Sequence, residues 1–133
     1  MKLGIIGVDV QKDIKNNDRI RDTLNQILID HPVSQIIALT TMSPGQGRMN
    51  KMAQEFATKE GLPFSEYFYE RNTAHYVRKR NTLFVREIRL LLVDLPKQYK
   101  SLKDVQHSST DNITNVVKTF LRKHHERYLY LVI

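Results

Sequence analysis

Residues 2–8 read KLGIIGV, a short apolar run at the start of the chain. Continuous apolar runs of this length are typical of strands buried on both faces of a parallel sheet. Residues 9–17 are polar, and Asn17 or Asp18 can cap a following helix. We therefore predict a buried first strand whose carboxyl end opens into a polar loop.

Four further apolar runs follow, and segments with helical periodicity separate them. Ile20, Leu24 and Ile27 recur at helical spacing, as do Met49, Ala53 and Phe56. A third helix is expected from Asn72 or Thr73 towards Arg86, and a fourth over residues 111–123. Residues 95–110 are predicted to be a long polar connection. The further predicted strands are 34–40 (SQIIALT), 62–68 (LPFSEYF), 88–94 (IRLLLVD) and 128–133 (YLYLVI).

This alternation of strand and helix predicts a parallel sheet with helices on both faces. We expect one Rossmann-like α/β domain over residues 1–133, in three layers, with a five-stranded parallel sheet in the order 3-2-1-4-5. Pro63 cannot donate a ladder hydrogen bond, so its strand is expected at an edge of the sheet.

Composition narrows the class of protein. The chain has 133 residues and no cysteine, which excludes disulfides and thiolate metal sites and favours the reducing cytoplasm. No apolar run approaches the roughly 18 residues of a membrane span, and no signal-peptide pattern opens the chain. The net charge of +7 has two interpretations, a solvated basic surface or an anionic partner such as a nucleotide or nucleic acid.

Ligands of open α/β sheets bind beyond the carboxyl ends of the strands, where the strand order reverses. Here that point lies between the first and fourth strands. The loop before the second helix contains Ser43, Gly45, Gly47 and Arg48. Its glycines permit close backbone approach, and the helix start offers N–H groups to an anion. Arg48 in the first turn opposes the helix dipole, so a bound anion would help to explain it. An ordinary Pro-Gly turn is the alternative.

Two other segments are expected near the same cleft. Ser109 and Thr110 precede the fourth helix, where they could hold a phosphate or simply cap the helix. The basic segment around Arg78 and Arg80 carries Tyr76, which lies one helical turn from Arg80. It could contact phosphates and stack on a base, or it could be a solvated helix face.

No catalytic or metal-binding set emerges from the sequence. The five histidines have no ligand spacing, and no nucleophile triad is suggested. Asp9, Glu66, Glu70 and Asp94 are the carboxylates expected nearest the cleft, so a general base or nucleophile could be among them.

Ordered features across nearly the whole chain resemble the SLOG superfamily of Rossmann-like proteins, which includes the DprA, LOG and small YspA- and YpsA-like families. The best stretch, YVRKRNTLFVREIRLLLVD, contains the Arg80-Asn81 pair that resembles an Arg-Asn pair of the superfamily. HSSTDNITNVVKTF looks like the motif that opens the fourth helix and binds phosphate or ribose, although Ser108 and Ser109 replace glycines there. The PGGxGT signature of the phosphoribohydrolase branch is absent. The resemblance implies binding of nucleotides or of nucleotide-derived signals.

Three hypotheses follow. The first is a sensor or sequestering protein that binds a nucleotide or an ADP-ribose-like ligand intact. The second is an enzyme of the N-glycosidase or deoxyribosyltransferase type, with Asp9 or Glu70 as the catalytic carboxylate. The third is a single-stranded nucleic-acid-binding protein, which the basic charge favours and the 8% aromatic content weakens. We expect no metal, no other cofactor, no membrane partner, and a homo-oligomer. The predicted ligand-binding residues are Gly7, Asp9, Ser43, Gly45, Gly47, Arg48, Arg80, Asn81, Ser109 and Thr110.

Overall fold

The computed structural model describes residues 1–7, 12–39, 47–67, 74–107 and 112–133. Five strands form one sheet in the order β3-β2-β1-β4-β5, and every neighbouring pair is parallel. This confirms the predicted fold class and strand order, and it places β3 and β5 at the two edges. The strands are β1 (Lys2–Gly7), β2 (Gln35–Leu39), β3 (Phe64–Tyr67), β4 (Leu90–Asp94) and β5 (Leu129–Val132).

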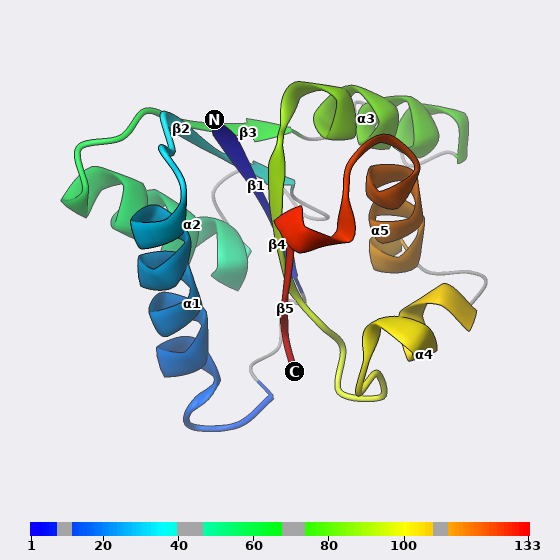
Figure 1. Ribbon diagram of the computed structural model, residues 1–133, viewed down its shortest axis with the longest axis horizontal. Helices are drawn as coiled ribbons and strands as arrows, with labels where there is room; N and C mark the ends of the chain where they lie inside the picture. The colour runs from blue at the N-terminus through cyan, green and yellow to red at the C-terminus, as the bar shows by residue number, and fades with distance from the viewer. Residues whose placement is uncertain (8–11, 40–46, 68–73, 108–111) are drawn as a thin grey trace.

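Helices cover both faces of the sheet (Figure 1). On one face lie α1 (Asn16–Asp30) and α2 (Arg48–Lys59), and on the other lie α3 (Ala74–Glu87), α4 (Leu102–His107) and α5 (Asn112–Lys123). A short 3-10 helix, η1 (Glu126–Tyr128), leads into β5. Right-handed crossovers between parallel strands produce this three-layer arrangement.

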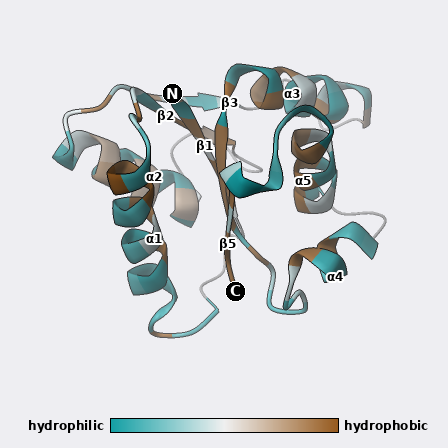
Figure 2. Ribbon diagram, in the orientation of Figure 1, coloured by the Kyte–Doolittle hydropathy of each residue, from teal (hydrophilic) through white to brown (hydrophobic). Residues whose placement is uncertain are grey.

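The strands supply both apolar layers because their side chains alternate between the two faces. Leu90 and Leu92 of β4 pack with α1 and α2, whereas Leu91 and Val93 pack with α3 and α5. Figure 2 shows the hydrophobic colour along β1 and β4, in the middle of the molecule, and polar colour on the outer helix surfaces. A sheet buried on both faces explains why the strands appear in the sequence as continuous apolar runs.

Helix ends follow local chemistry in part. Gly61 has a φ of 69°, in the left-handed region, and its N–H and that of Leu62 bond back to carbonyls at the end of α2. A glycine in this conformation is the usual residue just after the end of a helix. The start of α1 differs from prediction, because the helix begins at Asn16 rather than after a cap at Asn17 or Asp18.

The predicted polar connection over residues 95–110 was wrong in part, since α4 lies within it. Val105 is fully buried in the core on the α3 and α5 side and anchors this short helix. The Ser101 hydroxyl accepts the Asp104 N–H at 3.3 Å, and the Asp104 carboxylate accepts the Lys100 N–H at 2.8 Å. These two bonds, which resemble a capping box, fix the first turn of α4.

None of the helices in the described part of the chain has the length and apolarity needed to cross a membrane.

Candidate functional site

Asp94 is the centre of a charged cluster at the carboxyl edge of the sheet. It is the last residue of β4, pairs in register with Gly7 of β1 and Val132 of β5, and is fully buried. Asp94 follows Leu90 and Leu92 at two-residue intervals along the strand, so its side chain lies on the same face as theirs, towards α1 and α2. This position is the point where the strand order reverses, between β1 and β4.

Two cations contact this carboxylate from different segments. Lys12 Nζ lies 2.7 Å from Asp94 Oδ1, and Arg48 Nη2 lies 2.6 Å from Oδ2. Asn16 Nδ2 donates to Oδ1 at 3.1 Å. We call Lys12, Asn16, Arg48 and Asp94 the Asp94 cluster. It ties the segment before α1 and the start of α2 to the end of β4.

Both cations are largely removed from water. The side chain of Lys12 is 8% exposed and that of Arg48 is 15% exposed. Lys12 Nζ also donates to the Val132 carbonyl at 2.9 Å, and Arg48 Nη1 donates to Asn17 Oδ1 at 2.6 Å. Buried charges need such partners, because desolvation without compensation costs several kcal/mol per ion.

The Asp94 carboxylate also revises the interpretation of Arg48. A cation in the first turn of α2 opposes the helix dipole, and the sequence suggested that a bound anion would offset this. The structure shows that the protein supplies a carboxylate of its own at that place. Arg48 is therefore explained without a ligand, although it remains at the predicted cleft.

Gly7 makes this geometry sterically feasible. A Cβ atom at Gly7 would lie 2.7 Å from Asp94 Cβ and 2.8 Å from Met49 Cγ, well inside normal contact. The lack of a side chain thus lets β4 and the start of α2 approach the end of β1. Gly47, the other predicted glycine within the described residues, precedes α2 in an extended conformation and accepts the Lys51 N–H.

A second polar cluster joins α3 to α5. Arg80 Nε and Nη2 donate to Asn81 Oδ1 at 3.2 and 2.9 Å. Asn81 Nδ2 donates to Asn112 Oδ1 at 2.7 Å and to Asn115 Oδ1 at 2.9 Å. Arg80 is 4% exposed and Asn81 is 1% exposed, so the alternative interpretation as a solvated helix face does not apply to Arg80. We call these four residues the α3–α5 network.

The α3–α5 network stands next to a predicted phosphate segment. Asn112 opens α5 directly after residues 108–111, which contain Ser109 and Thr110. Its Nδ2 atom is buried and makes no hydrogen bond within the described residues. The network and the Asp94 cluster lie on opposite faces of the sheet, so the structure divides the predicted site between two layers.

Several predicted residues lie outside the described residues. Of the carboxylates expected near the cleft, Glu66 accepts a hydrogen bond from Asn50 Nδ2 at 2.8 Å, and Asp94 is paired with two cations. Among the described residues, no group of three or more metal-ligating side chains is present. The predicted residues outside the described ranges are Asp9, Ser43, Gly45, Glu70, Ser109 and Thr110.

Sequence reasoning missed Lys12 and Asn16 as members of the site. Both lie in the polar segment after the first strand, where the sequence offers many polar residues and no spacing rule that selects these two. Their partner Asp94 was recognised only as a carboxylate near the cleft. The ion pairs depend on packing of α1 and α2 against the sheet, which the local pattern does not specify.

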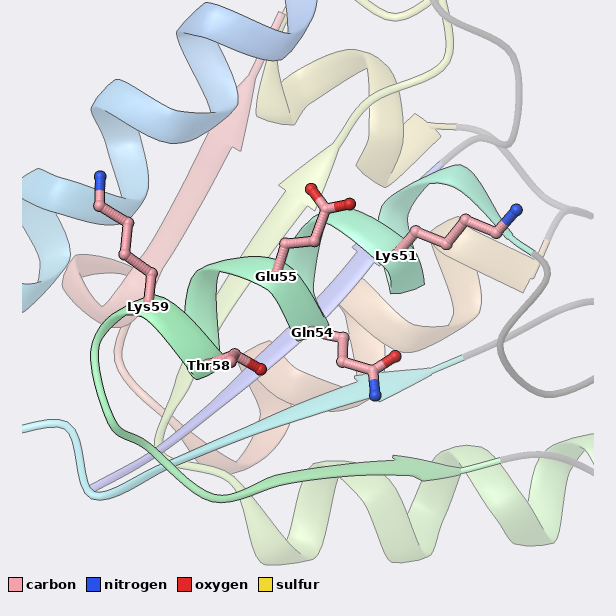
Figure 3. Close-up of a pocket in the computed structure, with 5 residues that line it drawn as sticks. All are labelled: Lys51, Gln54, Glu55, Thr58 and Lys59. Carbon is pink, nitrogen blue, oxygen red and sulfur yellow. The ribbon is translucent and has the colours of Figure 1, made fainter.

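The outer face of α2 carries a hollow of about 490 Å³ (Figure 3). Its lining comes from this one helix, and the side chains of Lys51, Glu55 and Lys59 spread apart along it. Binding sites are normally concave and formed by convergent groups. This hollow therefore does not compete with the carboxyl edge as a candidate site.

No family model matches this chain, and no curated protein matches it. The class of protein is thus defined by fold and site geometry, as a Rossmann-like α/β domain with a largely buried cation pair at its strand switch point.

Proposed function

We propose that this protein binds a nucleotide or a nucleotide-derived molecule such as ADP-ribose, and that it acts as a sensor or a sequestering protein in the cytoplasm. The observation that carries the proposal is the pair of cations, Lys12 and Arg48, positioned by Asp94 where β1 and β4 end. This is the edge at which sheets of this type bind nucleotides.

The Asp94 cluster supports anion binding through preorganisation. Each cation is already desolvated and oriented by a carboxylate that is itself fully buried. A phosphate arriving here gains charge-assisted contacts without first ordering flexible side chains. Lys12 has three N–H donors, of which the described residues accept two, at Asp94 and at the Val132 carbonyl.

The helix arrangement supports the same edge. Both α2 and α5 begin at the carboxyl side of the sheet, so their free N–H groups and positive dipole ends lie there. The resemblance of the sequence to the SLOG superfamily gives the ligand class within this proposal. The same resemblance includes Arg80 and Asn81. Asn81 bonds Asn112 and Asn115, which lie in the first turn of α5.

The first test is identification of a co-purified ligand. The protein would be purified natively and denatured, and released small molecules would be identified by mass spectrometry. An intact nucleotide or ADP-ribose derivative that raises the melting temperature of the emptied protein supports the proposal. A free base or a sugar phosphate would instead favour N-glycosidic bond cleavage, and no small molecule in either assay would contradict the proposal.

The second test examines the role of the cation pair at Asp94. Lys12→Met removes the ammonium while keeping the length of the side chain, and Lys59→Met is the matched exposed control on α2. We expect nucleotide affinity to fall at least about tenfold in Lys12→Met, equal to about 1.4 kcal/mol, and to change less than about twofold in the control. Circular dichroism would establish that both variants are folded. If folded Lys12→Met bound the nucleotide as tightly as the wild type, the proposed site would be contradicted.

Binding of single-stranded nucleic acid is a second candidate, and one observation favours it. The helices α3, α4 and α5 carry eight basic and two acidic side chains, whereas α1 and α2 carry five basic and four acidic ones. Arg78, Lys79, Arg86, Arg122 and Lys123 are exposed and form no ion pair within the described ranges. A one-sided positive surface of this kind fits a polyanion.

A further inference from the structure

A small hollow lies beside the Asp94 cluster, at the same edge of the sheet. It has a volume of about 180 Å³ and is formed where the segment after β4 faces the segment leading into α1. Lys12 lines it and also contacts Asp94, so the hollow and the Asp94 cluster share one side chain. The lining residues are Lys12, Asp13, Arg19, Pro96, Lys97, Tyr99, Lys100 and Ile133.

The lining is strongly cationic. It holds four basic side chains and one acidic side chain, and the acid, Asp13, is already paired with Arg19 at 2.9 Å. The hydrogen bond from Arg19 is the main cause of the lowered pKa of Asp13. Lys97 and Lys100 are exposed and make no ion pair with any residue of the described ranges.

Arg19 adds an unused donor. Its Nη2 atom bonds Asp13, but its Nε atom is buried and has no hydrogen-bond partner among the described residues. A buried N–H without an acceptor destabilises the protein, so an anion bound beside Arg19 would be favoured by accepting this hydrogen bond. Lys97, Lys100 and Arg19 thus line one space from two different segments of the chain, and the two lysines have no ion-pair partner among the described residues.

The size of the hollow limits the ligand. Pockets for whole drug-sized molecules have volumes of about 300–1,000 Å³, so this hollow fits a single chemical group. The only apolar side chains in its lining are those of Pro96, Tyr99 and Ile133. A small, cationic hollow is suited to a phosphate or diphosphate group.

We propose that this hollow binds the diphosphate of the ligand, with Lys97, Lys100 and Arg19 as its contacts. The ligand class is then a nucleoside diphosphate, or a molecule with an internal diphosphate, rather than a nucleoside or a free base. This inference rests on the proposed function for the identity of the whole ligand. Lys12 connects the two parts, because it lines the hollow and contacts Asp94 at the switch point.

The test uses inorganic diphosphate, ADP and adenosine with three proteins. These are the wild type, Lys97→Ala/Lys100→Ala, and Lys59→Ala/Lys123→Ala, a control that removes the same charge from exposed helix ends. Isothermal titration calorimetry gives affinities, and amide NMR shifts locate the binding. We expect diphosphate and ADP to bind the hollow variant at least about tenfold more weakly than the control, and to shift amides of residues 97–100 in the wild type.

The outcomes separate the hollow from the proposed function. The proposed diphosphate site is contradicted if diphosphate fails to bind the wild type. It is also contradicted if diphosphate binds Lys97→Ala/Lys100→Ala and the control equally. ADP whose affinity falls in the Lys12→Met variant of the second test above, but not in Lys97→Ala/Lys100→Ala, overturns the hollow and leaves the proposed function standing. Diphosphate that binds the hollow while neither ADP nor adenosine binds the protein supports the anion contacts and contradicts the nucleotide ligand.

Discussion

The stability of the buried Asp94 carboxylate depends on two opposed contributions, the cost of desolvation and the attraction to two cations. Complete burial of the carboxylate is costly, and contacts of 2.7 Å with Lys12 and 2.6 Å with Arg48 offset that cost. The two cations in turn rely on the carboxylate, since both are mostly buried. Removal of the negative charge therefore affects three ionised groups at once.

We expect Asp94→Asn to destabilise the protein by about 3–5 kcal/mol, because it leaves two mostly buried cations facing a neutral amide. Urea denaturation followed by circular dichroism measures this change. The control is Asp18→Asn, because the Asp18 carboxylate is 73% exposed and its ion pair with Arg21 is weak. If Asp94→Asn lowered the free energy of unfolding by less than about 1 kcal/mol, the ion pairs of Asp94 would not be needed to stabilise the fold.

A second ionic set links β3, α3 and β1 on the other face of the sheet. The Tyr67 hydroxyl donates to Glu87 Oε2, and Lys2 Nζ lies 3.0 Å from Glu87 Oε1. These bonds, that from Tyr67 first, lower the pKa of Glu87 from its ordinary value of 4.5. Burial, followed by the bond to Glu87, raises the pKa of Tyr67 to about 12.

The direction of each pKa shift sets a pH dependence. The depressed pKa of Glu87 means that its contribution to stability is present above pH 4.5 and is lost as the pH falls through the folded-state value. We expect Glu87→Gln to cost about 1 kcal/mol at pH 7, because both partners are part-exposed, and to cost little in acid. Thermal unfolding from pH 3 to pH 8, with exposed Glu55→Gln as the control, checks this. A constant difference across that range would refute the linkage.

The helices and strands whose apolar residues repeat over many positions were predicted correctly from the sequence. All five strands and the long helices were predicted, because burial on both faces and amphipathic packing leave a repeating signal. α4 was missed because six residues with one fully buried side chain give no period to recognise. The Ser101 and Asp104 spacing was the available signal, as a capping pattern.

Contacts between elements were less predictable than the elements themselves. Arg80 was grouped with its exposed basic neighbours, since a charged residue is seldom buried. Its burial follows from Asn81, which accepts two of its N–H groups and also bonds two residues of α5. No local pattern in α3 identifies partners on α5. The same limit applies to Lys12 and Arg48, whose common partner comes from β4.

Asn81 therefore fastens α3 to α5, and its loss should loosen that layer. We expect Asn81→Leu to cost about 2–4 kcal/mol, because it removes an acceptor from buried Arg80 and two bonds to α5. Hydrogen exchange should show reduced protection in α3 and α5 and unchanged protection in α1. Thr82→Ala, one residue further along α3, is the control, because the Thr82 hydroxyl bonds only within its own helix among the described residues. Uniform loss of protection would contradict a local role.

Over the whole molecule, the net charge of +7 is unevenly distributed. The two helix layers have similar amounts of helix but very different charge, and the excess lies over α3 and α5. The cations in the last turns of these helices, such as Arg86 and Lys123, also stabilise the helix dipoles. Arg78 and Lys79 lie nearer the start of α3, so the dipole does not account for them. They are the better markers of an anionic partner.

These two residues give a discriminating test of the nucleic-acid alternative. Anisotropy titrations with fluorescent oligothymidylate at several salt concentrations measure both affinity and the number of phosphates contacted, since the logarithmic slope is about −0.7 per phosphate for single strands. If α3 contacts nucleic acid, Arg78→Gln/Lys79→Gln should weaken binding and reduce the slope by about 1.4, whereas Lys51→Gln/Lys59→Gln on α2 should not. Equal effects of the two variants would mean that net charge alone attracts the polyanion. No measurable binding at low salt would exclude the nucleic-acid alternative.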